Sequence, residues 1–226
     1  MNVKLIAYSK PSELLETEGL TNAQELIAFC ARVSNPTNQM NTATSEKLIN
    51  YLVNNKHWSP LEMVSVTLEI ETTRDIARQI LRHRSFSFQE FSQRYADPTL
   101  HLAFTTREAR LKDEKNRQNS VSLDDSQEAK VLQRQWEEKQ NDIIALAKSS
   151  YQWAIDHGIA KEQARAVLPE GLTMSRLYMQ GTLRSWVHYI DLRSANGTQK
   201  EHMDIAVECA RVIAQIFPLI LNFTQH

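Results

Sequence analysis

The sequence predicts an α+β fold in which helices dominate. Apolar and polar residues alternate between Val64 and Ile70, which is typical of a strand with one buried face. Several longer stretches carry apolar residues three and four positions apart, the spacing of a helix packed on a core. The five glycines and six prolines are scattered through the 226 residues, and no Ser/Gly-rich or Pro-rich stretch separates two halves. We therefore expect residues 1–226 to form a single domain.

The N-terminal part is predicted to contain a short strand and two helices. The strand is indicated by the alternating apolar residues Val3, Leu5 and Ala7. Thr21 followed by Gln24 resembles a capping box, and apolar residues at helical spacing then continue to about Ser34. A second helix is expected from Ser45 to Asn54.

The clearest strand of the sequence leads into a helix and then into a run of basic residues. Its apolar side consists of Val64, Val66, Leu68 and Ile70, and its polar side of Ser65, Thr67, Glu69 and Glu71. Thr73 is suited to cap the next helix. The apolar stripe of that helix consists of Ile76, Ala77, Ile80 and Leu81. We expect the helix to end in the run Arg82-His83-Arg84.

Residues 105–125 are charged and aperiodic, so we expect an exposed loop there. A long amphipathic helix is expected from Ser126 to His157, with Gly158 at its left-handed C-terminal position. A short helix follows to Leu168 and is stopped by a proline.

The C-terminal part is predicted to hold two more helices. One runs from Thr182 to Leu192, and the apolar spacing of the other runs through Ile205 to Ile216. The preceding segment, which contains Leu177, Tyr178 and Met179, receives no assignment.

Charge and composition exclude several classes of protein. A formal net charge of -1 argues against a protein that wraps nucleic acid, which needs a broad cationic face, so any anion site must be local. Neither a long apolar stretch nor the apolar core of a signal peptide occurs, so we expect no membrane segment and a cytoplasmic protein. Cys30 and Cys209 lie in apolar helical contexts far apart in the sequence, so we expect buried free thiols rather than a disulfide or a metal pair.

The densest group of reactive side chains is the segment RHRSFSFQEFSQRY at residues 82–95. A solvated charged surface would not carry its three phenylalanines, and a core element would not carry its three arginines. Gln79 lies one turn before Arg82 and His83, so its amide and those cations can converge on one ligand. The spacing favours an anion-binding cradle beside an aromatic wall. The alternative is a structural ion-pair network.

The segment resembles the signature of flavin-dependent thymidylate synthases, RHRxxSxxExSxRY. Every fixed position matches, namely Arg82, His83, Arg84, Ser87, Glu90, Ser92, Arg94 and Tyr95. Gln89 departs from the family, which often carries Asn there. The segment His57–Glu62 is similar to the family's His-x-Ser/Thr-Pro-Phe-Glu segment. The resemblance covers most of the chain and implies a helix-rich single domain with a small, mostly antiparallel sheet.

The resemblance implies FAD as the cofactor. The residues that it assigns to FAD are Ser59, Arg82, His83, Arg84, Glu90, Arg184 and His188. Arg184 and His188 stand four apart on one predicted helix and therefore share a face. The alternative for the Arg-His-Arg run is a set of cations at a helix C-terminus, which is worth under about 1 kcal/mol. The role of His57 stays open, as does the choice between Gln199 and His202 as a neighbour of the flavin.

The resemblance also implies dUMP as the substrate. The residues that it assigns to dUMP are Gln79, Arg82, Glu90, Phe91, Ser92, Gln93, Arg94, Arg165 and Arg193. Guanidinium groups suit the phosphate, and amide or backbone groups suit the uracil edge. Arg165 taken alone would be a surface ion-pair residue. Arg193 resembles a catalytic arginine placed against the uracil ring, where its charge favours ionisation of N3; its pKa above about 12 excludes it as the base.

The implied activity is the reductive methylation of dUMP to dTMP, with 5,10-methylenetetrahydrofolate as one-carbon donor and NADPH-reduced FAD as hydride source. Neither cysteine lies in the cation-rich setting of a thiolate nucleophile, and no Gly-rich dinucleotide fingerprint occurs. The family shares its sites among subunits, which implies a homotetramer. Two alternatives remain: another nucleotide-binding flavoprotein reductase, and a catalytically silent RNA-binding or structural protein that uses the basic aromatic patch.

Overall fold

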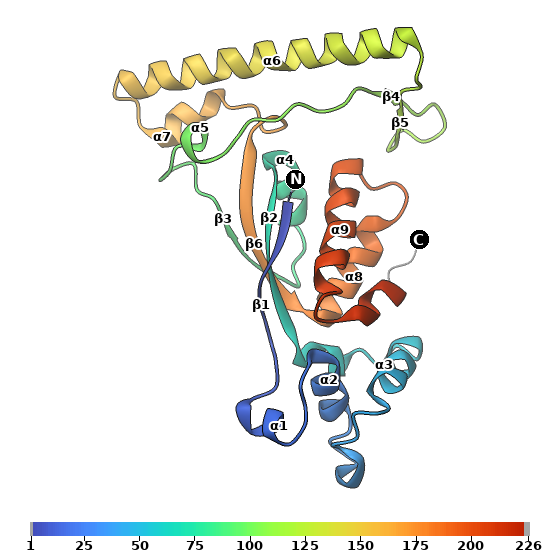
Figure 1. Cartoon of the computed structure of the whole chain (residues 1–226). Coiled ribbons are helices and arrows are strands. Elements are labelled where there is room, and N and C mark those ends of the chain that lie inside the picture. Colours follow the sequence, from blue (N-terminus) through green and yellow to red (C-terminus); the bar gives the residue numbers. More distant parts are fainter. Residues whose placement is uncertain (1, 224–226) are drawn as a thin grey trace.

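The computed structural model describes residues 2–223 and is built around one antiparallel sheet (Figure 1). The strand order is β1 (Asn2–Tyr8), β2 (Ser65–Thr73), β6 (Met174–Thr182) and β3 (Ser87–Glu90), and every neighbouring pair is antiparallel. Helices α8 (Leu183–Ser194) and α9 (Lys200–Ile213) pack on one face of this sheet (Figure 1). The predicted α+β class with a small antiparallel sheet is confirmed.

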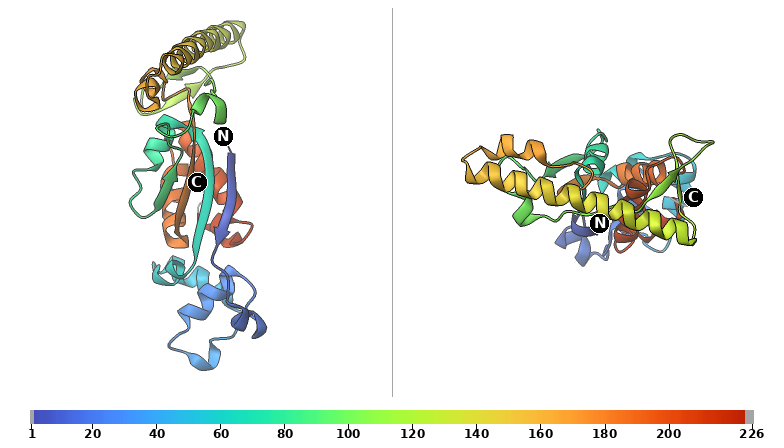
Figure 2. Two further views of the ribbon diagram at one scale, coloured as in Figure 1. Left: turned by 90° about the vertical axis from the view of Figure 1, so that its left-hand side faces the viewer. Right: turned by 90° about the horizontal axis from the view of Figure 1, so that it is seen from above.

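The remaining elements gather at the two ends of the sheet. One end carries α1 (Glu13–Thr17), α2 (Ala23–Ala31) and α3 (Ser45–Asn54), and the other end carries α5 (Pro98–His101), α6 (Gln127–Asp156) and α7 (Lys161–Ala164) (Figure 2). Helix α4 (Arg74–Ile80) follows β2 directly. The short 3-10 helices are η1 (Pro36–Asn38), η2 (Ser59–Met63), η3 (Arg165–Val167) and η4 (Pro218–Asn222).

The alternation along β2 produces the expected buried face. Its apolar residues Val66, Leu68 and Ile70 are fully buried, as is Val64 immediately before the strand. The indole N–H of Trp186 on α8 donates to the carbonyl of Val66 over 3.1 Å, which ties the helix to the strand. Glu69 on the opposite side is also buried, and its carboxylate accepts a hydrogen bond from Lys4 over 3.1 Å.

Strand β6 is the element that the sequence did not assign, and it occupies the middle of the sheet between β2 and β3. Its inward positions Leu177 and Met179 are fully buried, whereas Tyr178 between them is exposed. A side chain on Gly181 would meet the Phe86 ring at 2.4 Å. Only glycine therefore allows the segment after the Arg-His-Arg run to approach the sheet this closely.

Helix α2 differs from the expectation at both of its ends. Helix α2 is capped by Asn22, whose side chain accepts from the amide of Glu25, so the predicted Thr21–Gln24 box is one residue out of register. The helix also ends at Ala31, short of Ser34. Helix α3 has the predicted bounds.

Thr73 precedes α4, but its side chain caps no backbone amide. Its hydroxyl instead donates to Oδ1 of Asp75 over 2.7 Å and accepts from the guanidinium of Arg107 over 2.7 Å. The helix ends at Ile80, so the Arg-His-Arg run lies in the following turn rather than on the helix.

The long helix α6 is confirmed, with Ser126 accepting a hydrogen bond from the amide of Ala129 and Gly158 at φ +74°. It lies across one end of the molecule (Figure 1). The exposed excursion expected over residues 105–125 contains a hairpin that the sequence did not indicate, formed by β4 (Arg110–Lys112) and β5 (Ser120–Ser122). The hairpin gave no signal, since each strand has three residues and its apolar residues are exposed.

Both cysteines are free, as expected. Cys209 is fully buried on α9, and burial raises the pKa of its thiol. Cys30 is only half-buried, which corrects the expectation of two buried thiols, because the surface around it on α2 is incompletely covered. Across residues 2–223, no helix has both the length and the apolar character needed to cross a membrane.

Candidate functional site

The Arg82-His83-Arg84 run lies in the turn between α4 and β3 and sends its side chains in different directions. Arg82 and Arg84 are exposed, and neither forms an ion pair within residues 2–223. His83 is half-buried, and its ring meets the edge of Tyr189 on α8 at a centroid distance of 4.9 Å. The turn therefore holds its histidine against the helix layer while both guanidinium charges stay available to an anion.

His83 is held by Arg193 from the last turn of α8. The Nε–H of Arg193 donates to Nε2 of His83 over 2.9 Å. His83 must be neutral to accept this bond, with its proton on Nδ1. Burial, followed by the charges of Arg193 and Arg82, lowers the pKa of His83 to about 4, which keeps the ring neutral at physiological pH.

A chain of hydrogen-bonded polar side chains passes behind this pair, and it runs from the buried Tyr189 and His202 to the half-buried Gln79, Gln199 and Glu201. The Tyr189 hydroxyl lies 3.1 Å from Nε2 of His202, and Nδ1 of His202 lies 3.3 Å from Oε1 of Gln79. Gln79 then donates to Oε1 of Gln199 over 2.9 Å, and Gln199 donates to Glu201 over 2.9 Å. Both residues that the sequence left as alternatives, Gln199 and His202, are thus partners of Gln79.

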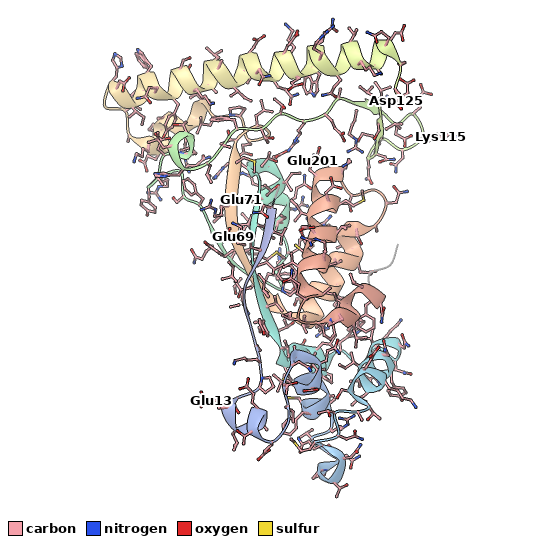
Figure 3. The ribbon with its side chains drawn as sticks, viewed as in Figure 1. Glu13, Glu69, Glu71, Lys115, Asp125 and Glu201 are labelled. Atoms are coloured by element: carbon pink, nitrogen blue, oxygen red, sulfur yellow. The ribbon has the colours of Figure 1, made fainter. Side chains whose placement is uncertain are left out.

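The polar chain borders an open cleft. A cleft of about 600 Å³ lies between the β4–β5 hairpin, α6 and the start of α9. Its walls include Arg107, Arg110 and Trp136 together with Gln199 and Glu201. The labelled side chain of Glu201 marks the α9 side of this region in Figure 3.

A second group of predicted residues lies at the other end of α8. Arg184 is exposed and pairs with Glu62 of η2, and the ring of His188 lies 4.4 Å from that of Trp58. Ser59 follows Trp58 and is exposed. Burial and the neighbouring Arg184 charge lower the pKa of His188. The group joins the start of α8 to η2 through the Arg184–Glu62 ion pair and the Trp58–His188 ring contact.

Glu90 at the end of β3 faces the sheet rather than the Arg-His-Arg turn. Its Oε1 accepts from the hydroxyl of Ser175 over 2.8 Å and lies 3.5 Å from Nη1 of Arg74. Phe91 then continues the ladder, because its amide donates to the carbonyl of Arg176 over 2.8 Å. The sheet thus fixes the backbone of the segment that follows.

The rest of the signature, from Ser92 to Tyr95, contacts helix α7 through Arg94 and Tyr95. Nε of Arg94 lies 3.3 Å from Oε2 of Glu162, and Nε of Arg165 donates to the backbone carbonyl of the same Glu162 over 3.2 Å. Arg94 and Arg165, which are both predicted to contact dUMP, are therefore neighbours. Gln93 is 3% exposed, and its Nε2 makes no hydrogen bond within residues 2–223.

One chain does not bring all the predicted residues to one surface. Arg184 and Arg193 are nine positions apart on α8, which places them on opposite sides of the helix and about 13 Å apart along it. The Arg94–Arg165 pair belongs to the end of the sheet that carries α5, α6 and α7 (Figure 1). His57 does not contact the motif turn, which is the turn formed by Arg82-His83-Arg84. It is exposed, and its ring lies 6.4 Å from that of Tyr51.

Sequence reasoning missed four residues that organise these groups, namely Trp58, Glu162, Tyr189 and Glu201. Tyr189 lies four residues before Arg193, on the same helix face, and this spacing was a usable signal. Glu201 gave no signal, because its partner Gln199 precedes the helix that carries it. Together, the exposed guanidiniums of Arg82 and Arg84 and the neutral histidine between them form a candidate anion-binding site, with donors of the kind that a phosphate group needs.

Comparison with known proteins gives consistent matches along nearly the whole chain. The thymidylate synthase complementing protein family matches residues 13–219. The probable flavin-dependent thymidylate synthase of Paramecium bursaria Chlorella virus 1 is 46% identical over 224 residues and 97% of each chain. The flavin-dependent thymidylate synthase of a Synechocystis species is 46% identical over 220 residues, again 97% of each chain.

A solved structure shows the same fold. The UMP/dUMP methylase PolB from Streptomyces cacaoi, bound with 5-Br dUMP, gives a TM-score of 0.76 at 25% identity and covers 98% of this chain and 93% of its own. The chain belongs to the thymidylate synthase complementing protein family.

Proposed function

We propose that the chain catalyses the reductive methylation of dUMP to dTMP, with 5,10-methylenetetrahydrofolate as one-carbon donor and NADPH as the source of reducing equivalents for FAD. The observation that carries this proposal is the motif turn: Arg82 and Arg84 are exposed and unpaired within residues 2–223, and Arg193 is locked against His83 beside them. The flavin-dependent activity of the 46% identical relatives supports the same conclusion.

The donor set of the turn fits FAD. The guanidiniums of Arg82 and Arg84 offer planar donors for a diphosphate, and His83 holds the turn against α8. Arg184 and His188, with Ser59, offer a cation, a ring and a hydroxyl on a second surface. FAD supplies the hydride chemistry when it is bound. In this proposal Glu90 contacts FAD through its backbone. The contacts of its side chain with Ser175 and Arg74 hold that backbone in place.

The remaining predicted residues suit dUMP. Arg94 and Arg165 share Glu162 and present two cations for the phosphate. Gln79 and Arg193 supply an amide and a planar cation for the uracil edge. Phe91, Ser92 and Gln93 complete the nucleotide contacts, and the unsatisfied Nε2 of buried Gln93 leaves a donor for the ligand. Arg193 would stabilise negative charge developing on the uracil ring.

The separation of these groups supports a homotetramer with shared sites. Because Arg184 and Arg193 face opposite sides of α8, one flavin-sized ligand meets both sets most simply when a second subunit completes the site. Helix α6 also carries large apolar side chains that are exposed in the isolated chain, namely Leu132, Trp136, Ile143, Leu146 and Trp153. Successive members of this set are four, seven, three and seven residues apart, which keeps them on one side of the helix, and Leu146 is 68% exposed in the isolated chain.

The test of this function is tritium release from dUMP labelled at C5, with the purified protein, FAD and NADPH. We expect tritium release together with formation of dTMP, whose new methyl carbon comes from methylenetetrahydrofolate. Both should occur together only when methylenetetrahydrofolate is present. A yellow protein that oxidises NADPH but leaves dUMP unchanged under all conditions would instead be a flavoprotein reductase. A methyl-transfer reaction that consumes NADPH and a reduced folate also agrees with the expected cytoplasmic location.

A further inference from the structure

The polar chain behind the motif turn has a single allowed direction. It runs from Tyr189 through His202 and Gln79 to Gln199 and Glu201. A carboxylate can only accept hydrogen bonds, so Gln199 must turn its NH₂ group to Glu201 and its carbonyl oxygen to Gln79. Gln79 must then turn its own NH₂ group to Gln199.

The inner half of the chain agrees with this direction. The carbonyl oxygen of Gln79 faces Nδ1 of His202, so His202 carries its proton on Nδ1 and accepts at Nε2 from the Tyr189 hydroxyl. His202 is fully buried, and burial with the Arg193 and His83 charges lowers its pKa to about 3, so the ring stays neutral. Burial raises the pKa of Tyr189, which keeps its proton for donation.

If every hydrogen bond of the chain ran in the opposite direction, only the bond between Gln199 and Glu201 would lack a donor. His202 can exchange tautomers, and the Tyr189 hydroxyl can accept as well as donate. Reversal would, however, turn the carbonyl oxygen of Gln199 toward the Glu201 carboxylate, where two acceptors face each other without a proton. Glu201 is therefore the residue that sets the direction of the chain.

The direction of the chain fixes the orientation of the half-buried amide of Gln79. After its internal bonds, one N–H and one carbonyl lone pair remain for a ligand, in a fixed order. Uracil offers an acceptor at O4 beside a donor at N3, whereas cytosine offers a donor at N4 beside an acceptor at N3. An amide held in one orientation therefore forms both hydrogen bonds with one of these base edges. With the other edge it places donor against donor and acceptor against acceptor.

We infer that Glu201, acting through Gln199, is a specificity-determining positioning residue that locks the Gln79 amide in the orientation that selects uracil over cytosine. This inference rests on the proposed function, in which Gln79 meets the uracil edge. It assigns to Glu201 no contact with the nucleotide.

The experiment compares Kd values for dUMP and dCMP by titration calorimetry on the FAD-loaded protein. Glu201→Gln keeps the shape of the side chain but provides a terminal amide that accepts either chain direction. Gln199→Met breaks the chain at its middle and gives a second test if the first variant does not fold. Glu208→Gln is the matched control, because it makes the same change on α9, where Glu208 pairs with Arg211 instead.

The parent and Glu208→Gln should bind dUMP far more tightly than dCMP. In Glu201→Gln and Gln199→Met, the ratio of the dCMP Kd to the dUMP Kd should fall at least about tenfold, or about 1.4 kcal/mol, chiefly through tighter dCMP binding. A merely structural loss would weaken both nucleotides together and leave the ratio unchanged, which would overturn the inference. A parent that binds no dUMP would instead defeat the proposed function, and the inference with it.

Discussion

Arg193 and His83 are 110 residues apart in sequence and form a 2.9 Å hydrogen bond from Nε to Nε2. The donor is Nε, the guanidinium nitrogen bonded to Cδ of Arg193. The two terminal nitrogens, Nη1 and Nη2, have no protein partner within residues 2–223. The plane of the guanidinium is therefore set by the motif turn, while its outer edge stays available to a substrate.

Replacing Arg193 by Lys should affect turnover much more than binding. Lysine keeps the charge but has no Nε to hold against His83 and no planar edge. We expect FAD and dUMP affinities within about tenfold of the parent, or about 1.4 kcal/mol, and a far larger loss in kcat. Calorimetry and dTMP formation measure the two effects. Arg211→Lys, at an exposed ion pair on α9, should change neither. Equal losses in affinity and rate would contradict the role of Arg193.

Arg82→Ala and Arg84→Ala should purify as folded proteins with little bound FAD. Neither guanidinium supports the fold through an ion pair in the described chain, so its removal should cost little stability. Flavin absorbance per chain after desalting is the measurement. Arg78→Ala is the control, since Arg78 is exposed one turn earlier and pairs with Glu170. Full flavin occupancy in both motif variants would show that the Arg-His-Arg run does not hold the cofactor.

His202 should make the stability of the protein depend on pH. Its folded pKa of about 3 lies below the ordinary 6.5, so the unfolded chain takes up this proton first as the pH falls. Stability from neutral His202 is complete above pH 6.5 and is lost as the pH falls toward 3.

Between those values, the free energy of unfolding of the parent should fall about 1.4 kcal/mol per pH unit more steeply than that of His202→Gln. Urea unfolding at a series of pH values measures both slopes. Parallel slopes would mean that His202 is not held neutral by the fold.

The protein should be a tetramer of about four times 26.0 kDa by light scattering. Replacing Leu146 and Trp153 by Glu places charges among the exposed apolar residues of α6 and should lower the mass. Glu replacements of Leu14 and Val33, which are also exposed but lie near α1 and α2, form the matched control. An active parent that runs as a monomer would refute the shared site.

Sequence patterns predicted the elements whose burial is one-sided. Strand β2 and helices α3 and α6 followed from alternation, helical spacing and caps. Strand β6 was missed because its inward residues include Ser175 and Gly181 along with two apolar residues, which weakens the alternation. The β4–β5 hairpin has no buried face to produce a pattern.

The sequence also predicted the chemistry of the site, but it did not predict which residues would contact one another. The motif indicated an anion site because cations and aromatic residues alternate there. The Arg193–His83 bond and the polar chain through Gln79 join residues more than 100 positions apart, and their pairing depends on how α4, α8 and α9 pack. No local spacing encodes such contacts. The assignment of individual residues to FAD and dUMP stays a prediction.

The most direct test of the flavin-dependent mechanism is anaerobic dTMP formation by the FAD-loaded parent and by the double variant Cys30→Ala, Cys209→Ala. Burial raises the pKa of both thiols, so neither is suited to attack the uracil ring. Loss of the buried Cys209 sulfur should cost about 1–2 kcal/mol of stability, and circular dichroism checks the fold. We predict dTMP from both proteins, and only with dUMP, methylenetetrahydrofolate and NADPH together. A folded, FAD-loaded double variant without turnover, and a dUMP adduct trapped on a cysteine of the parent, would contradict it.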